Sequence, residues 1–209
     1  GYIMNDIGSL YYNKMDLDKA LDFLSRSNTI LKEVGNKHGI GRSLNQMGDV
    51  HSLKGQYDKA LEYYGNALEM NNVERRFIMS TYYRLGTIWF YKDNTSKALD
   101  YFEKYLNIRN EILEESIELS ALTLISLSYK QIGKEFDIEE IDKLITESDD
   151  ISYSTHFLLY KLLNNSDHLI KAYDKVQEKA KKLENELKEK FFSYPIPKQI
   201  IDYHNSINS

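Results

Sequence analysis

Residues 48–68 read GDVHSLKGQYDKALEYYGNAL, and the spacing of small and large residues in this stretch decides the fold. Gly48 is followed by a ring after three residues, an alanine after twelve and a large apolar residue after sixteen. The same pattern starts at Gly8 and at Gly86, so the glycines stand 40 and 38 residues apart. The matching positions are the rings Tyr11, His51 and Trp89, the alanines Ala20, Ala60 and Ala98, and the large residues Leu24, Tyr64 and Phe102. This agreement predicts a repeated structural unit.

Each unit is expected to be a pair of antiparallel helices. Large residues four and one before the glycine share one helical face with the ring three after it. A short break, such as Lys54-Gly55-Gln56, precedes a second helix that carries the alanine. Glycine and alanine allow the two helices to approach closely, and a single pair cannot bury its apolar face unless it stacks on another. The sequence therefore predicts an all-α, right-handed superhelical stack of helix pairs.

The stretch 48–68 resembles the tetratricopeptide-repeat family. The matching residues are Gly48, Gly55, Tyr57, Ala60, Leu61, Tyr64, Ala67 and Leu68. The family's usual period is about 34 residues, so the longer spacing here is similar to its long-repeat variant, seen in motor-protein light chains, polarity adaptors and bacterial regulators. HEAT and armadillo arrays also have periods near 40 residues, but they do not explain the glycine–ring–alanine spacing. The resemblance covers roughly residues 1–133.

The repeats are expected to form an array over residues 1–148, with a different ending. The units are placed at about 1–37, 38–74, 75–112 and 113–148. The last is degenerate, because Ile138 stands at the alanine position and Asp142 at the ring position. Residues 149–209 are expected to add a degenerate helical pair, a long capping helix and a fold-back tail. This ending loosely resembles tetratricopeptide sensor regions of multidomain signalling proteins.

The long helix carries an apolar stripe made of Leu169, Tyr173, Val176, Ala180, Leu183 and Leu187. The stripe fits a capping helix that covers the last repeat. The alternative is a coiled-coil seam through which two chains associate.

Composition excludes several classes of function. The 209 residues carry a net charge of −5, which disfavours general binding to nucleic acid or to anionic membranes. No apolar run approaches the roughly 18 residues of a membrane span. The absence of cysteine excludes disulfides and thiolate metal sites, and it favours a cytoplasmic protein.

No motif for catalysis, a cofactor or a metal stands out. The run from Gly35 to Ser43 has glycines and an arginine, but its spacing differs from that of a phosphate-binding loop, which also follows a strand. No two of the five histidines lie three or four residues apart, and His51 occupies a ring position that predicts core packing. We therefore expect a protein without enzymatic activity, cofactor or metal.

The resemblance implies that the first helix of each pair lines a concave groove that binds a partner. The residues expected there are Asn5, Ser9, Tyr12, Asn13, Arg42, Asn45, Asp49, Tyr83, Thr87, Phe90, Tyr91 and Lys130. Asn5 and Asn45 occupy equivalent positions, and asparagine ladders in long-repeat relatives hold an extended peptide by its backbone. The alternative is that these residues only reflect a composition rich in asparagine. Tyr83, Phe90 and Tyr91 would supply an aromatic anchor.

The expected function is a protein-interaction module that binds a neutral or mildly acidic extended peptide, or a partner helix. A regulatory segment of a larger signalling protein is the first alternative, and the opening residue Gly1 in place of methionine favours it. The second alternative is a homo-oligomer, formed through an exposed end of the array or through the C-terminal helix.

Overall fold

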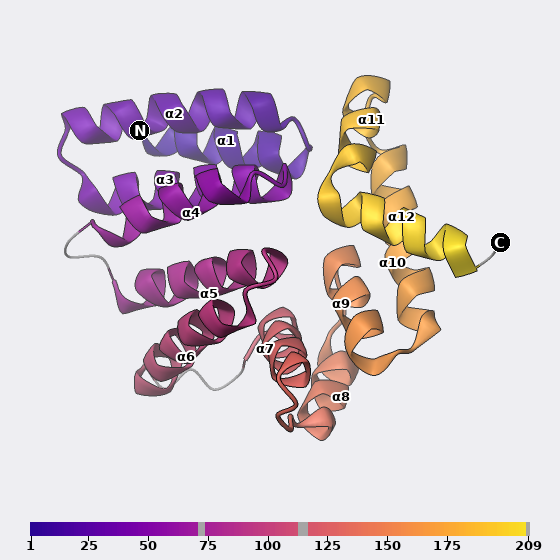
Figure 1. The fold of residues 1–209 in the computed structure, drawn as a ribbon. Coiled ribbons are helices and arrows are strands. Elements are labelled where there is room, and N and C mark those ends of the chain that lie inside the picture. The colour runs from indigo at the N-terminus through magenta and orange to yellow at the C-terminus, as the bar shows by residue number, and fades with distance from the viewer. Residues whose placement is uncertain (71–73, 113–116, 208–209) are drawn as a thin grey trace. The chain divides into compact units, whose positions relative to one another are not determined.

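The computed structural model describes residues 1–70, 74–112 and 117–207, and this part of the chain forms twelve α-helices and no strand (Figure 1). The helices are α1 (Tyr2–Asn13), α2 (Leu17–Glu33), α3 (Lys37–Leu53), α4 (Tyr57–Leu68), α5 (Arg75–Tyr91), α6 (Thr95–Glu111), α7 (Leu119–Gln131), α8 (Ile138–Glu147), α9 (Tyr153–Leu163), α10 (Ser166–Lys181), α11 (Asn185–Ser193) and α12 (Pro195–Ile207). The fold is all-α with helices packed in pairs, as the sequence predicts.

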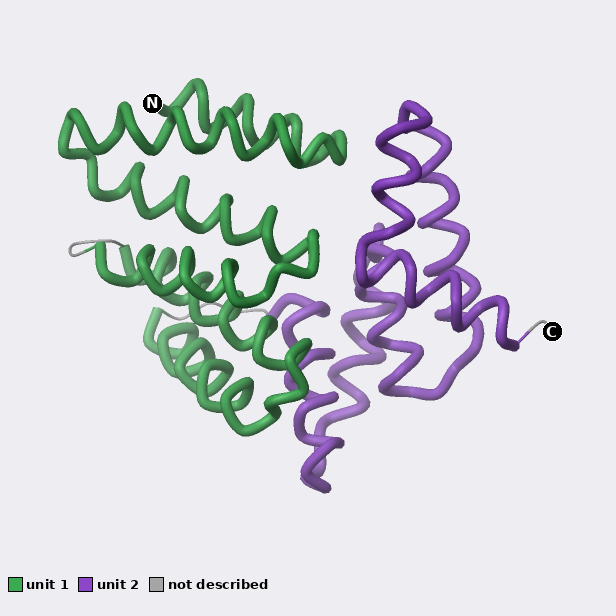
Figure 2. The backbone as a smooth tube through the Cα atoms, turned by 45° about the horizontal axis from the view of Figure 1, so that its top comes forward, with its two compact units in different colours: residues 1–113 green, residues 114–209 purple. Residues whose placement is uncertain are grey.

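The chain divides into two compact units, Gly1–Leu113 and Glu114–Ser209 (Figure 2). In unit 1 the pairs are α1 with α2, α3 with α4, and α5 with α6. Each second helix also contacts the next first helix, so that α2 packs on α3 and α4 packs on α5. Since α1 also contacts α3 and α3 contacts α5, the first helices form one continuous layer.

The repeat glycines are the points where paired helices meet. A Cβ atom built on Gly8 would overlap the side chain of Leu24, one built on Gly48 would overlap the ring of Tyr64, and one on Gly86 would overlap the ring of Phe102. Each bulky partner stands sixteen residues after its glycine and is nearly inaccessible to solvent. The spacing found in the sequence is therefore the spacing of one recurring close contact.

Local capping explains where several helices of unit 1 begin. Asp16, Asn36 and Asn94 each accept a hydrogen bond from the backbone N–H three residues later, which satisfies an otherwise unpaired donor of the first turn. The turns between helices use positive φ, as at Gly55 with φ 73°, a conformation that glycine adopts without a steric penalty.

Two interpretations of individual residues are confirmed in unit 1. His51 is a packed core histidine: its ring is buried, stacks on Tyr63 with 5.2 Å between ring centroids, and its Nδ1 lies 2.6 Å from Oε1 of Gln56. The glycine-rich run 35–43 is a turn followed by the start of α3, and Gly39 and Gly41 are buried inside that helix.

Unit 2 (α7–α12) is built differently from the repeats. Here α9 packs on α7 and α10, and α12 packs on α9, α10 and α11. The apolar stripe of α10 is used inside this unit, because Leu169, Val176 and Ala180 are each almost completely buried. That burial comes from packing of α10 on α9, α11 and α12 within the unit.

The long C-terminal helix expected from the sequence is two helices. The chain leaves helical geometry after Lys181 and re-enters it at Asn185, so α11 packs back on α10 and on α12. This reversal buries Phe191 completely and Tyr194 almost completely. The tail then forms α12, thirteen residues long, with Ile200 at its buried centre.

The contact at Gly48 gives a prediction with an internal control. Gly48→Ala should destabilise the chain by about 1–3 kcal/mol, because the new methyl group overlaps the buried Tyr64 ring. Gly65→Ala should instead be neutral or stabilise by up to about 1 kcal/mol, because a Cβ on Gly65 meets no atom within 4 Å and alanine favours helix. Urea denaturation of both variants measures the difference. Equal stabilities would refute the close contact.

Candidate binding surface

The first-helix layer of unit 1 contains a pocket of about 220 Å³. Its lining residues come from α1, α2, α3 and α5, and they are Ser9, Tyr12, Asn13, Leu24, Gln46, Asp49 and Arg84. Apart from Leu24 these side chains are polar or aromatic, and the two charges are one of each sign. Four of them, Ser9, Tyr12, Asn13 and Asp49, are residues that the sequence predicts for the groove.

A hydrogen-bonded chain joins α1 to α3 at one side of the pocket. The Ser9 hydroxyl donates to the backbone carbonyl of Asn5 at 3.1 Å, and Nε2 of Gln46 donates to Ser9 Oγ at 2.6 Å. Because the single hydroxyl proton of Ser9 is used on Asn5, Gln46 must present its NH₂ group to Ser9. Its Oε1 then points elsewhere, and it is buried with no partner in the described part of the chain.

A second network fixes the charged side of the pocket. The Tyr64 hydroxyl and Nε of Arg84 both donate to Oδ1 of Asp49, each at 2.8 Å, and the Arg84 guanidinium also donates to the carbonyl of Ser80 at 3.1 Å. Burial alone would lower the pKa of Arg84, but attraction to Asp49 and their hydrogen bond outweigh it and raise the pKa. Burial, followed by the nearby Asp49 charge, raises the pKa of Tyr64, which remains a donor.

The two asparagines expected at the groove lie deeper than the sequence suggests. Asn45 is 4% exposed, and its Nδ2 donates to the hydroxyl of Thr81 on α5 at 2.7 Å. Asn5 is 1% exposed, and neither atom of its amide group has a partner among the described residues. Asn45 therefore ties α3 to α5, beneath the surface rather than on it.

The aromatic residues expected at the groove pack partly against their own unit. Tyr83 contacts the rings of Phe102 and Tyr105 on α6, and Tyr91 stacks on Tyr57 with 6.0 Å between centroids. Phe90 is buried. Thr87 donates to the carbonyl of Tyr83, one turn earlier in α5. None of these four lines the pocket.

The two basic residues expected at the groove have separate roles. Arg42 on α3 donates to Asp6 on α1 at 3.1 Å, an exposed ion pair. Lys130 belongs to unit 2, where its ammonium donates to the carbonyl of Leu162 at 2.6 Å. The structure places neither of them in the pocket.

Gln46 and Arg84 line the pocket but were absent from the sequence-based set. Both stand two residues before the repeat glycine, at Gly48 and Gly86. Positions −2, +1 and +5 relative to that glycine are separated by three and four residues and share a helical face. The predicted columns were −3, +1 and +5, so they differ from this face only at their first position, where Asn5 and Asn45 lie buried and do not line the pocket.

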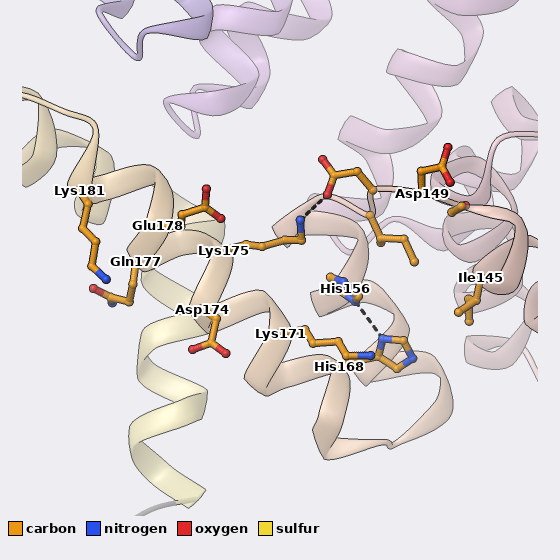
Figure 3. A pocket seen from close by; sticks show the side chains of 13 residues that line it. Ile145, Asp149, His156, His168, Lys171, Asp174, Lys175, Gln177, Glu178 and Lys181 are labelled. Carbon is orange, nitrogen blue, oxygen red and sulfur yellow. Dashed lines mark hydrogen bonds and ion pairs between the residues drawn. The ribbon is translucent and has the colours of Figure 1, made fainter.

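Unit 2 has a larger pocket of about 710 Å³, shown in Figure 3. It lies between the end of α8, residues 148–151 and one face of α10, and four carboxylates and three lysines line it. His156 and His168 face each other there, with their Nδ1 atoms 2.9 Å apart. In the part of the chain that the structure describes, no three His, Cys, Asp or Glu residues form a group that could hold a metal ion.

Burial lowers the pKa of both imidazoles of this pair, which favours their neutral forms. Burial, reinforced by His168 and the nearby Lys171 and Lys175, lowers the pKa of His156 to about 4. Burial, with Lys171, also lowers the pKa of His168. Facing carboxylates oppose these shifts without cancelling them: Asp150 for His156, and Asp167 and Asp142 for His168.

The architecture of unit 1 defines a class of helical repeat proteins, in which stacked antiparallel helix pairs present their first helices as one layer. Comparison with known families agrees, since residues 2–72 match the tetratricopeptide-repeat family. Over this segment the chain is similar to tetratricopeptide-repeat proteins. None of the helices in the described residues is sufficiently long and apolar to span a membrane.

Solved structures support the fold at low sequence identity. Two crystal structures are similar, both of the Podospora anserina protein assigned as a kinesin light chain with nearly identical tetratricopeptide-like repeats. One of them, a form with a single substitution, has a TM-score of 0.54 at 13% identity, covering 99% of this chain and 95% of that one. The other has a TM-score of 0.54 at 14% identity, covering 97% and 95%. The search of curated proteins found no match.

The histidine pair predicts a loss of stability in mild acid. Because the folded state keeps both imidazoles neutral while the unfolded chain takes up protons near pH 6.5, stability is complete above that pH and falls as the pH drops towards 4. The loss should be on the order of 1–3 kcal/mol.

Chemical denaturation between pH 7 and pH 4.5 measures this effect. In the double variant His156→Gln, His168→Gln, the free energy of unfolding should depend less steeply on pH. Some dependence should remain because burial also lowers the pKa of His51. Replacement of the exposed His38 by Gln serves as the control and should leave the dependence unchanged. An unaltered slope in the double variant would rule out the pair as its source.

Proposed function

We propose that unit 1 binds an extended segment of a partner protein across α1, α3 and α5, with the 220 Å³ pocket at its centre. Tetratricopeptide repeats are in general protein-interaction modules, and the stacked first helices provide the continuous surface that such a segment requires. Binding of a partner protein is the general part of this proposal, and the extended conformation of the bound segment is the more specific part.

One observation carries the proposal: amide groups at the first-helix layer are buried without partners. Oε1 of Gln46, Oδ1 of Asn45 and both amide atoms of Asn5 make no hydrogen bond within the described residues. Native proteins leave few buried polar groups unpaired, so such groups point to a partner outside the chain, and Gln46 is the one of these three residues that lines the pocket. A peptide backbone supplies both N–H donors and C=O acceptors, and they recur at each residue along its length.

The residues expected to contact the partner follow from this geometry. Asn13 takes the role of backbone pairing, because it lines the pocket, whereas Asn45 already holds Thr81. Tyr12 is the aromatic side chain at the pocket and serves as the anchor. The similarity in period to long-repeat relatives supports backbone recognition by amides in the same layer.

A synthetic library of random twelve-residue peptides, selected on the whole chain, tests this function. The strongest binder, labelled and measured by fluorescence polarisation, should lose about thirtyfold in affinity with Tyr12→Ala, because truncating a central aromatic anchor commonly costs about 2 kcal/mol.

The matched control is Lys182→Ala, on an exposed side chain that pairs with Glu178 one helical turn earlier, and it should leave affinity unchanged. Circular dichroism melts establish that both variants are folded. Failure to select any binding peptide, or equal loss from both substitutions, would overturn the proposal.

A further inference from the structure

We infer that the pocket of unit 1 receives an uncharged carboxamide side chain, asparagine or glutamine, from the bound segment. This inference rests on the proposed function and goes beyond it, because it specifies which chemical group of the partner the pocket accepts. Three properties of the pocket lead to it: its charge balance, its unused hydrogen-bonding atoms and its size.

Charge balance excludes an ionised group. Arg84 and Asp49 are the charged residues of the lining, and they neutralise each other through the 2.8 Å bond from Nε to Oδ1. The Tyr64 hydroxyl holds the same carboxylate oxygen, so Asp49 is fixed from two sides. A carboxylate entering the pocket would meet Asp49, and an ammonium group would meet Arg84. Either charge would meet one attractive and one repulsive partner, so the lining offers an ionised group no net counter-charge.

The unused atoms require both a donor and an acceptor from the ligand. Oε1 of Gln46 is buried and unpartnered among the described residues, and its orientation is fixed by the bond from Nε2 to Ser9. It therefore needs an N–H or O–H group. Both bonds to Asp49 use Oδ1, which leaves Oδ2 as a second acceptor. The guanidinium of Arg84 has five N–H groups, and it donates one hydrogen bond to Asp49 and one to the carbonyl of Ser80.

A primary carboxamide matches this set of atoms. Its NH₂ group offers two donors, for Gln46 and for Asp49, and its oxygen accepts from Arg84. A hydroxyl group has one donor and cannot satisfy both acceptors. The volume of 220 Å³ is below the roughly 300–1,000 Å³ of sites for whole small molecules, so it suits a single side chain presented by a longer segment.

The peptide library described above, read position by position, tests the inference on the intact chain. Selected peptides should share one position restricted to Asn or Gln. Replacing that residue by Asp, Glu or Lys should weaken binding at least tenfold.

Gln46→Glu provides the decisive variant, because it places a carboxylate where the unpaired amide oxygen stands and should shift the restricted position to Lys or Arg. Gln177→Glu makes the same chemical change in the pocket of unit 2 and should leave the preference for Asn and Gln intact. Gln46→Leu removes the acceptor without adding charge and should abolish the preference. Circular dichroism and thermal melts confirm that each variant is folded before it is compared.

The outcomes separate the two claims. Peptides that bind with Asn or Gln at one position, and switch to Lys or Arg in Gln46→Glu, support the inference. Peptides that bind with a charged or apolar residue at every restricted position, or whose preference is the same in Gln46→Glu, overturn the inference and leave the proposed function standing. The absence of any binding peptide overturns the proposed function as well.

Discussion

The close approach of paired helices at Gly8, Gly48 and Gly86 is the constraint on which unit 1 depends. A side chain at these positions would occupy the space of Leu24, Tyr64 or Phe102, so the backbones can meet only where a Cβ is missing. The bulky partner fills the space that the glycine leaves, and both become inaccessible to solvent. Since interiors are packed to crystal-like density, a contact of this kind fixes the position of each helix within its pair.

The same contact organises the binding surface. The Tyr64 ring lies against Gly48 in the core, and its hydroxyl reaches Asp49, the next residue along α3, which in turn holds Arg84 on α5. The core contact of one repeat thereby positions a polar group that links two repeats. The hydrogen bonds hold Asp49 and Arg84 in fixed positions relative to each other, and preorganisation of this kind reduces the entropy that binding of the proposed segment must overcome.

Unit 2 packs its helices around a core that does not use the glycine contact of the repeats. Its core is formed by Phe157, Leu159, Val176 and Phe191, all nearly inaccessible, and the reversal after Lys181 is needed to bring Phe191 into it. Burying His156 and His168 together in this unit keeps both rings neutral at a cost in stability that appears only in acid. The repeats tolerate a single buried histidine, His51, by giving it a glutamine partner.

The sequence by itself determined the repeated helix pairs of unit 1, because the spacing of glycine, ring and alanine acts over a few positions of the chain. The first helices of these pairs, α1, α3 and α5, form one layer. Packing decided which residue at the first position of each column reaches the pocket: Asn5 and Asn45 lie buried, whereas Gln46 and Arg84, each one residue after the predicted position in its repeat, line the pocket. One residue corresponds to about 100° of rotation, so a pattern of polar positions alone cannot fix this choice. The break between α10 and α11 was likewise decided by tertiary structure, since neither glycine nor proline marks it and the packing of α11 on α10 and α12 buries Phe191.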